Sequence, residues 1–101
     1  MNTQRIRHQV IFCLKSGPTG EATDNFLKDG TSLLSAIPGV EGFSAFRQVS
    51  PKNDYDFGFS MDFADKAVYE AYNNHPVHVA FVKDRWQTAV SRFLEIDSQG
   101  I

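Results

Sequence analysis

The stretch from Tyr55 to Phe63 alternates between large apolar side chains and small or polar ones. Successive side chains of a strand point to opposite faces of its sheet, so this pattern predicts a strand with one apolar and one polar face. The apolar residues are Tyr55, Phe57, Phe59, Met61 and Phe63, and the others are Asp56, Gly58, Ser60 and Asp62. We expect helices to cover the apolar face, and water or a wet, close-packed partner to cover the other.

Three more segments are predicted to be strands. Residues 6–14 alternate with one clearly apolar face, on which His8 is the single polar member. Residues 40–49 form a less regular strand, and residues 89–96 form the last one, which Asp97 closes. One face of that last strand carries Val90, Leu94 and Ile96, with Arg92 among them.

Three segments are predicted to be helices. Apolar residues recur at three- and four-residue intervals over residues 22–37, and Thr19 is the expected N-cap of this helix. Gly30 lies in the middle of it, where a glycine on the buried side indicates either a close neighbour or open space. Residues 65–74 form a second helix capped by Asp65, and a short third helix covers about residues 77–84.

The predicted order, β-α-β-β-α-β, is that of the ferredoxin-like α+β fold. In that fold two helices cover one face of a four-stranded antiparallel sheet. A length of 101 residues is that of one domain, so we expect residues 1–101 to form a single unit. The uncovered sheet face suggests a second copy of the chain packed against it, that is, a homodimer.

Composition excludes several classes of protein. The net charge of −2 provides no basic surface for nucleic acid. A single cysteine, Cys13, rules out an intrachain disulfide. The sequence contains no apolar run long enough to cross a membrane and no long apolar segment at its N-terminus. We therefore expect a soluble, cytoplasmic protein without nucleic-acid or membrane partners.

The residues best suited to chemistry lie between Tyr72 and Phe81. Pro76 lacks an N–H and disfavours helical geometry at His75, so the second helix should stop or kink there. His78 follows in the first turn of the next segment. An imidazole is a suitable base for a proton next to a carbonyl group, and a phenol such as that of Tyr72 can donate to the oxygen that gains charge.

Three sequence elements resemble the family of stress-responsive dimeric α+β barrel proteins. They are HQVIFCLK at residues 8–15, Ile37-Pro38-Gly39-Val40, and Tyr72-x-x-His75-Pro76-x-His78-Val79, and the similarity extends over about residues 5–97. The Tyr and HPxH element is the most specific of them. The resemblance implies a homodimer in which two sheets face each other and form a barrel with the helices outside.

The resemblance also implies roles for individual residues. The sequence is similar at these positions to a plant enzyme of the family, olivetolic acid cyclase, which closes a linear polyketide by an aldol reaction without a cofactor. On that basis His78 would be the general base, Tyr72 its assistant and Asp97 a neighbour that orients the base, while His8 would line the pocket. A tyrosine of the cyclase pocket would fall at Gly30, so the pocket of this chain should differ in shape.

We therefore expect the catalytic residues to be His78, Tyr72 and Asp97, and the ligand to be a small apolar or aromatic ketone. The expected ligand-binding residues are His8, Val10, Phe26, Leu27, Gly30, Phe59, Met61 and His75. His75 is alternatively a residue that hydrogen-bonds the backbone at the helix end, and His8 a core histidine whose hydrogen bonds are satisfied. A metal site from the three histidines has no supporting ligand spacing, and we expect no metal and no cofactor.

Two other functions remain open from the sequence. The first is a non-catalytic dimer that binds a ligand or acts in a stress response, in which case Phe26, Phe57, Phe59 and Met61 could fill the space beside His78. The second is a cofactor-independent monooxygenase that acts on an electron-rich phenol. Because one fold serves many chemistries, the choice between these functions has to come from the site.

Overall fold

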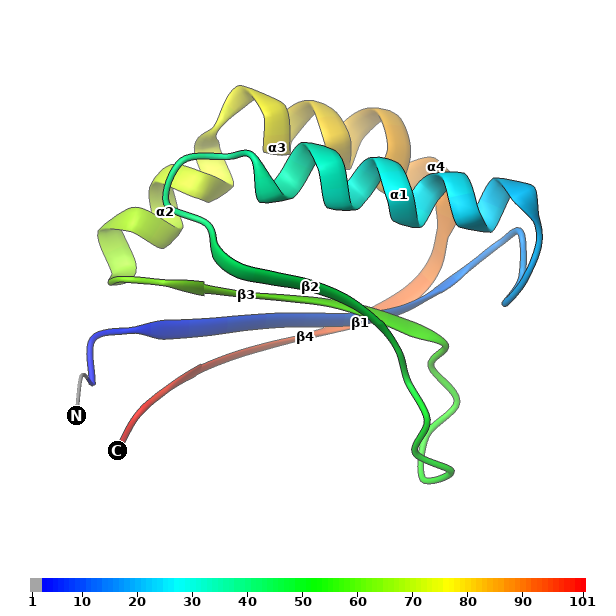
Figure 1. The fold of residues 1–101 in the computed structure, drawn as a ribbon, viewed down its shortest axis with the longest axis horizontal. Helices are drawn as coiled ribbons and strands as arrows, with labels where there is room; N and C mark the ends of the chain where they lie inside the picture. Colours follow the sequence, from blue (N-terminus) through cyan, green and yellow to red (C-terminus); the bar gives the residue numbers. More distant parts are fainter. Residues whose placement is uncertain (1–2) are drawn as a thin grey trace.

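The computed structural model describes residues 3–101 of the chain. In chain order the elements are β1 (Ile6–Leu14), α1 (Glu21–Ser35), β2 (Glu41–Arg47), β3 (Phe57–Phe63), α2 (Lys66–Asn74), α3 (Pro76–Phe81), the π-helical turn η1 (Val82–Trp86), α4 (Gln87–Ala89) and β4 (Val90–Gln99). The predicted β-α-β-β-α-β order is confirmed. The consecutive elements α2, α3, η1 and α4 together take the place of the second helix (Figure 1).

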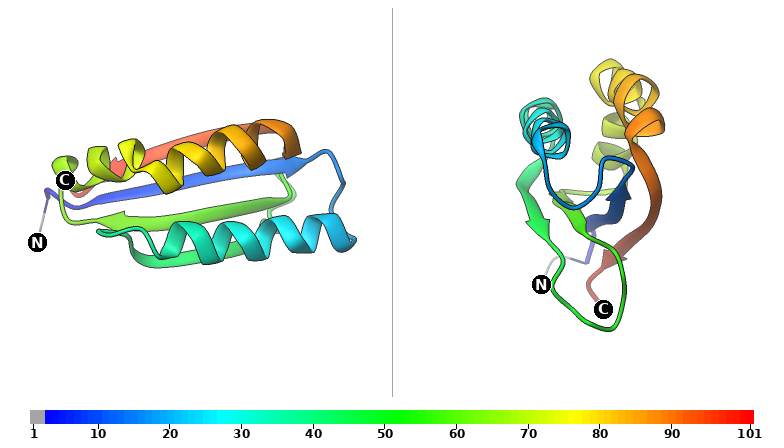
Figure 2. Two further views of the ribbon diagram at one scale, coloured as in Figure 1. Left: turned by 90° about the horizontal axis from the view of Figure 1, so that it is seen from above. Right: turned by 90° about the vertical axis from the view of Figure 1, so that its right-hand side faces the viewer.

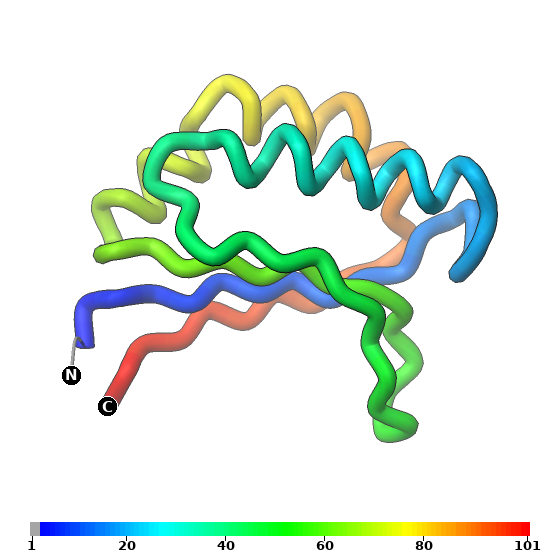
Figure 3. The backbone as a smooth tube through the Cα atoms, viewed as in Figure 1, coloured from blue at the N-terminus to red at the C-terminus, as the bar shows by residue number. Residues whose placement is uncertain are grey.

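The four strands form one antiparallel sheet in the order β2-β3-β1-β4. Over the described residues, the helices all lie on the same face of this sheet, which we call the inner face, and the opposite face has no helix on it (Figures 1 and 2). This is the ferredoxin-like arrangement. The two ends of the described chain lie close together at one end of the sheet, as the backbone trace shows (Figure 3).

The core lies between the helices and the inner face. The alternating residues of β1 and β3 supply most of it, because each strand points every second side chain toward the helices. Phe12, Phe59 and Phe63 are completely buried there. The other buried apolar residues of this cluster are Val10, Leu14, Phe26, Leu34, Ile37, Phe57, Met61, Tyr72, Phe81 and Val90.

A β-bulge in the pairing of β1 with β4 corrects one detail of the sequence interpretation. Leu14 is paired with Val90 but Cys13 with Arg92, so β4 has one extra residue at this point. Val90 therefore lies in the core, whereas Leu94 and Ile96 remain 47% and 45% exposed. The simple alternation that placed these residues on one face breaks at the bulge.

Several predicted boundaries also differ from the structure. The strand predicted over residues 40–49 is shorter, and the last strand does not close at Asp97 but continues to Gln99. The helix predicted to end near residue 84 continues through η1 and α4 to Ala89. Within residues 3–101, none of the helices has the length and apolar character needed to cross a bilayer.

The helix ends were predicted with mixed success. Thr19 is not the N-cap of α1; Gly20 occupies that position and no side chain caps it. Its φ of 115° is a conformation that a glycine adopts easily. Asp65 does cap α2, since its carboxylate accepts a hydrogen bond from the Val68 N–H at 2.9 Å. The break at Pro76 is confirmed as well, because His75 has extended backbone and separates α2 from α3.

The face of the sheet without helices, which we call the open face, carries exposed apolar side chains along the edge strand β4 and polar side chains on the central strands. Leu94 lies opposite Ile11 in the β1–β4 register, and Ile96 lies opposite Gln9. Across the two central strands, Arg7 of β1 forms an ion pair with Asp62 of β3 at 3.0 Å. The ring of Phe46 lies over Gly58, where a Cβ would come within 2.2 Å of it. Gly58 therefore lets an aromatic ring lie flat on this face.

Candidate active site

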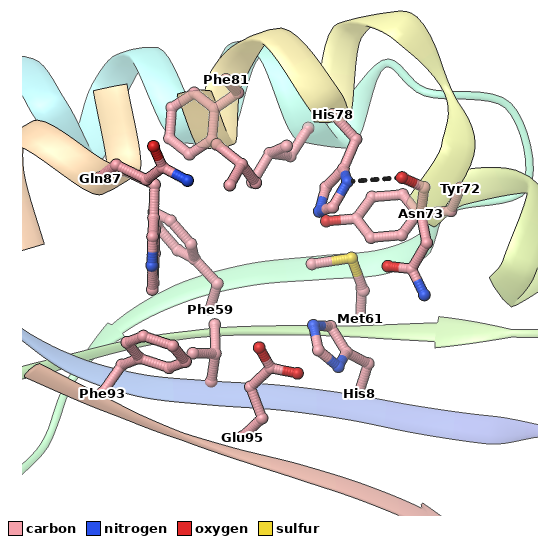
Figure 4. A pocket seen from close by; sticks show the side chains of 14 residues that line it. His8, Phe59, Met61, Tyr72, Asn73, His78, Phe81, Gln87, Phe93 and Glu95 are labelled. Carbon is pink, nitrogen blue, oxygen red and sulfur yellow. Dashed lines mark hydrogen bonds between the residues drawn. The ribbon is translucent and has the colours of Figure 1, made fainter. Parts of the chain in front are cut away.

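A cavity of about 340 Å³ lies between the helices and the inner face of the sheet (Figure 4). Sites for small ligands are typically concave, mostly apolar and supplied with a few polar groups, and this cavity has that character. Its 14 lining residues are His8, Val10, Leu34, Phe59, Met61, Tyr72, Asn73, His78, Phe81, Val82, Trp86, Gln87, Phe93 and Glu95.

The cavity has a polar end and an aromatic end. His8, Tyr72, Asn73 and His78 gather at one end, below the junction of α2 and α3 (Figure 4). The rings of Phe59, Phe81 and Phe93 lie toward the other end (Figure 4). A ligand that fits both ends would have an apolar or aromatic body and a polar group near the histidines.

Tyr72 and His78 lie side by side because Pro76 breaks the helix between them. The last turn of α2 carries Tyr72, which is 2% exposed, and the first turn of α3 carries His78, which is half-buried. Their ring centroids are 4.5 Å apart. The predicted pair is therefore brought together at the wall of the cavity.

The hydrogen bond of His78 fixes which nitrogen can act as a base. Its Nδ1 lies 3.0 Å from the backbone oxygen of Asn73. A carbonyl oxygen only accepts hydrogen bonds, so Nδ1 carries a proton and donates it. In the neutral ring the lone pair is then on Nε2, which is the nitrogen left to accept a proton from a ligand.

Burial keeps both groups in the protonation state that such chemistry needs. Burial lowers the pKa of His78 below 6.5; the hydrogen bond to Asn73 opposes this effect, and the neighbouring His8 adds to it. Burial, with the nearby Tyr69 and Glu95, raises the pKa of Tyr72 above its ordinary value. At neutral pH the imidazole is thus a free base and the phenol a hydrogen-bond donor.

Asp97 does not orient His78 as expected. It lies directly opposite His8 in the β1–β4 register, and its Oδ1 is 2.6 Å from Nδ1 of His8. The hydroxyl of Tyr69 donates to the other carboxylate oxygen, Oδ2, at 2.8 Å. Orientation of His78 instead comes from the backbone of Asn73, so no carboxylate is needed on that side.

His8, Asp97 and Tyr69 form a hydrogen-bonded group across the cavity from the α2–α3 junction. His8 is 7% exposed and comes from the inner face of β1. The Tyr69 hydroxyl also lies 3.1 Å from its Nδ1. The ring centroids of His8 and Tyr72 are 6.3 Å apart, so both histidines belong to the same polar end.

Four of the eight expected ligand-binding residues line the cavity and four do not. Those that line it are His8, Val10, Phe59 and Met61. The residues outside its lining are Phe26, Leu27, Gly30 and His75. Phe26 packs in the core, 3% exposed, and Leu27 packs against the same cluster. His75 caps α3, where its Nδ1 accepts a hydrogen bond from the Val77 N–H at 3.1 Å.

Other side chains pack closely against Gly30, so the glycine does not leave an open space. A Cβ at this position would lie 2.8 Å from the ring of Phe59 and 3.3 Å from the ring of Phe81. Both rings line the cavity. The absence of a side chain at Gly30 thus lets these two rings pack against α1, and the cavity gains no extra space at the glycine itself.

The sequence interpretation missed the cavity residues that follow α3. Val82, Trp86 and Gln87 come from η1 and α4, and π-helical turns frequently occur at functional sites. Phe93 and Glu95 come from the inner face of β4. Alternation with Asp97 is the signal that would have found this pair, since all three residues are odd-numbered in one strand.

One group of side chains has the residue types of a metal site. His8, Glu95 and Asp97 place one potential ligand atom each within 4.8 Å of one another. This set differs from the three histidines considered from the sequence. In the structure the nitrogen of His8 nearest to Asp97 is already engaged in their hydrogen bond. Two of its three members, His8 and Asp97, are therefore already paired with each other.

Comparison with known proteins gives a family-level match. The model of the stress responsive A/B barrel domain matches residues 6–99. A search of curated protein sequences finds no match.

Solved structures share the fold over nearly the whole chain. A protein of the same family from Mesorhizobium loti, with a ferredoxin-like fold, is 53% identical; the match covers 97% of this chain and 98% of that one, with a TM-score of 0.95. A dimeric ferredoxin-like protein from Thermobifida fusca is 19% identical, with 99% and 94% covered and a TM-score of 0.78. A hydroxynitrile lyase from Passiflora edulis is 15% identical, with 98% and 95% covered and a TM-score of 0.84.

Proposed function

The chain belongs to the stress responsive A/B barrel domain family, and from this premise we propose that it is a homodimeric enzyme that abstracts a proton next to a carbonyl group without a cofactor. The observation that carries the proposal is the arrangement of His78. Its Nδ1 is held by the Asn73 carbonyl, its ring lies against Tyr72, and both residues line a cavity that side chains leave open.

The proposed reaction begins with a ketone whose body lies among the aromatic rings. Nε2 of His78 takes a proton from the carbon next to the carbonyl group, and the electron pair of that C–H bond moves to form an enolate. The Tyr72 hydroxyl donates a hydrogen bond to the enolate oxygen as it gains charge. This pairing of a neutral base with a protonated phenol is what the lowered pKa of His78 and the raised pKa of Tyr72 favour.

Two outcomes are open to the enolate. Attack on a second carbonyl of the same molecule gives a ring, as in the reaction of olivetolic acid cyclase, and return of the proton at a different carbon gives an isomer. In both, the His78 imidazolium returns its proton and the enzyme regains its starting state. A hydroxynitrile lyase shares the fold, so an enzyme with this architecture is known, and this supports the enzymatic interpretation.

The homodimer is proposed through the open face. That face carries the exposed apolar side chains of Leu94 and Ile96 beside Ile11. Relatives with this fold are dimeric, the Thermobifida fusca protein among them. Two open faces packed together would bury these side chains and leave both cavities beneath their own helices.

The proposal is tested by hydrogen–deuterium exchange at the carbon next to a ketone. Simple aryl methyl ketones exchange slowly in D2O, and NMR follows the loss of the methyl proton signal. We expect the wild type to accelerate exchange and His78→Ala to lower the rate by about 100-fold or more, the range typical of a lost general base. Tyr72→Phe should lower it as well, by less.

His75→Asn is the matched control, because it replaces a nearby histidine with a residue that still caps α3. It should exchange at the wild-type rate. A His78→Ala protein that remains dimeric and exchanges as fast as the wild type would contradict the assignment. A wild type that binds ketones without accelerating exchange would instead favour the non-catalytic, ligand-binding function, which the open cavity also allows.

A further inference from the structure

The charged residues in the cavity lining bear on which carbonyl compounds the cavity can bind. We propose that Glu95 makes the cavity selective for neutral carbonyl compounds over carboxylates of the same shape. The inference rests on the proposed function for the class of ligand, and it concerns binding and not turnover. Three observations carry it. They are the charges that line the cavity, the lack of an ion pair to Glu95 within residues 3–101, and the division of the cavity into a polar and an aromatic end.

Of the lining residues within 3–101, only Glu95 is an Asp, Glu, Lys or Arg. The lining thus has a carboxylate and no lysine or arginine to pair with an anionic ligand. The histidines do not alter this balance. His78 is neutral at pH 7, and His8 is paired with the carboxylate of Asp97, so that a protonated His8 would give a pair with no net charge.

No ion pair neutralises Glu95 within residues 3–101. The nearest arginine in its own strand, Arg92, binds Asp54 on the open face, and Arg85 binds Asp29 of α1 at 2.7 Å. Both guanidinium groups are therefore engaged away from the cavity. The charge of Glu95 extends to the polar end, where it contributes to the raised pKa of Tyr72 and opposes the lowering of the pKa of His78.

Binding of a ligand that bears a carboxylate would be unfavourable. With its ring among Phe59, Trp86 and Phe93, whose rings lie together, its carboxylate would lie between Glu95 and the polar end (Figure 4). Among the described residues, the lining has no lysine or arginine to replace the water that this carboxylate loses. A neutral ketone has no such penalty, because its single oxygen needs only one donor and Tyr72 provides it. Repulsion by an exposed carboxylate is screened by water, so Glu95 should contribute a moderate part of the selectivity.

The test compares two ligands of nearly the same shape, acetophenone and benzoate. The chain has a single tryptophan, Trp86, and it lines the cavity, so its indole N–H signal in NMR reports occupancy by either ligand. Titrations are done at pH 7, low salt and in the presence of EDTA, which removes any cation that could bridge His8, Glu95 and Asp97 to an anion.

We expect acetophenone to bind the wild type at least ~10-fold more tightly than benzoate. In Glu95→Gln the ratio should fall by about three- to tenfold, and the change should come from tighter binding of benzoate. Glu70→Gln is the control, since it removes an exposed carboxylate of α2 that does not line the cavity. It should leave the ratio unchanged, and added salt should weaken the effect of Glu95 only.

Equal or tighter binding of benzoate to the wild type overturns the inference, and so does an unchanged ratio in Glu95→Gln. Failure of both ligands to shift the Trp86 signal at millimolar concentration overturns it too, because selection requires occupancy. The outcome is separable from the exchange experiment. Selective binding without ketone exchange would leave the inference standing for a ligand-binding protein and would reject the enzyme.

Discussion

At the scale of single residues, the position of the protons matters most, and His78 shows why. Its Nδ1 donates to a backbone carbonyl, so the residue acts as a base only while its other nitrogen is unprotonated. Burial lowers its pKa below 6.5. A lower pKa keeps the base form present at more acidic pH than an exposed histidine would allow.

We therefore predict that the rate of ketone exchange rises with pH through a single pKa below 6.5 and is already constant at pH 7. The same shift affects folding: the unfolded chain binds the proton more tightly, so the stability due to neutral His78 is lost as pH falls below 6.5 toward the folded-state pKa. Rates measured from pH 5 to 8 check the first statement, and urea unfolding of wild type and His78→Gln checks the second. A midpoint above 6.5 would contradict both.

The sequence predicted Tyr72 and His78 as a pair because Pro76 breaks the helix between them, and the two residues are only six positions apart. It failed for Asp97, whose partner depends on the register of two strands that lie far apart in the chain. In the structure that register places Asp97 opposite His8. Tyr69 was missed for a related reason, since its role exists only once α2 packs above the end of β4.

At the scale of elements, α1 and the helical segment after Pro76 determine the shape of the cavity. The two buried rings that touch Gly30, those of Phe59 and Phe81, also line the cavity. A side chain added at Gly30 therefore acts on the cavity through these rings.

We predict that Gly30→Ala destabilises the protein by about 1 to 2 kcal/mol, because overpacking a buried contact outweighs the gain in helix propensity. It should also weaken ketone binding, as the rings move toward the cavity. Ser32→Ala, at an exposed position of the same helix, should be neutral or slightly stabilising. Thermal unfolding and the Trp86 titration measure both effects. A Gly30→Ala protein as stable as Ser32→Ala would show that the rings have room to move.

Element types and order were predictable because each apolar face repeats with the period of its element. The bulge in β4 and the π-helical turn were not, since each inserts a residue into a regular repeat without a sequence signal of its own. The π-helical turn accounts for the missed residues Val82, Trp86 and Gln87, whereas Phe93 and Glu95 follow the regular alternation of β4 with Asp97. Both irregularities change which side chains face inward after the point where they occur, so Val90 was grouped with the wrong face.

At the scale of the whole molecule, the open face is the feature that a monomer leaves unexplained. The chain covers one side of its sheet with helices and leaves Leu94 and Ile96 about half exposed on the other. These two side chains lie in line along β4, next to Ile11 of β1. Exposed apolar side chains grouped on one sheet face are what a face-to-face dimer would bury.

We predict that Ile96→Asp converts the dimer to a monomer, because two copies of the new carboxylate would be buried near each other without a partner. Val79→Asp is the control: Val79 is 52% exposed but lies on α3, away from the open face. It should leave the dimer intact. Light scattering coupled to size-exclusion chromatography measures the mass of each.

Because the helices, and not the open face, cover the cavity, a monomeric Ile96→Asp protein that still binds acetophenone would show that each chain forms its site alone. Loss of binding together with the dimer would instead mean that the partner chain helps to hold β4, and with it Glu95, in place.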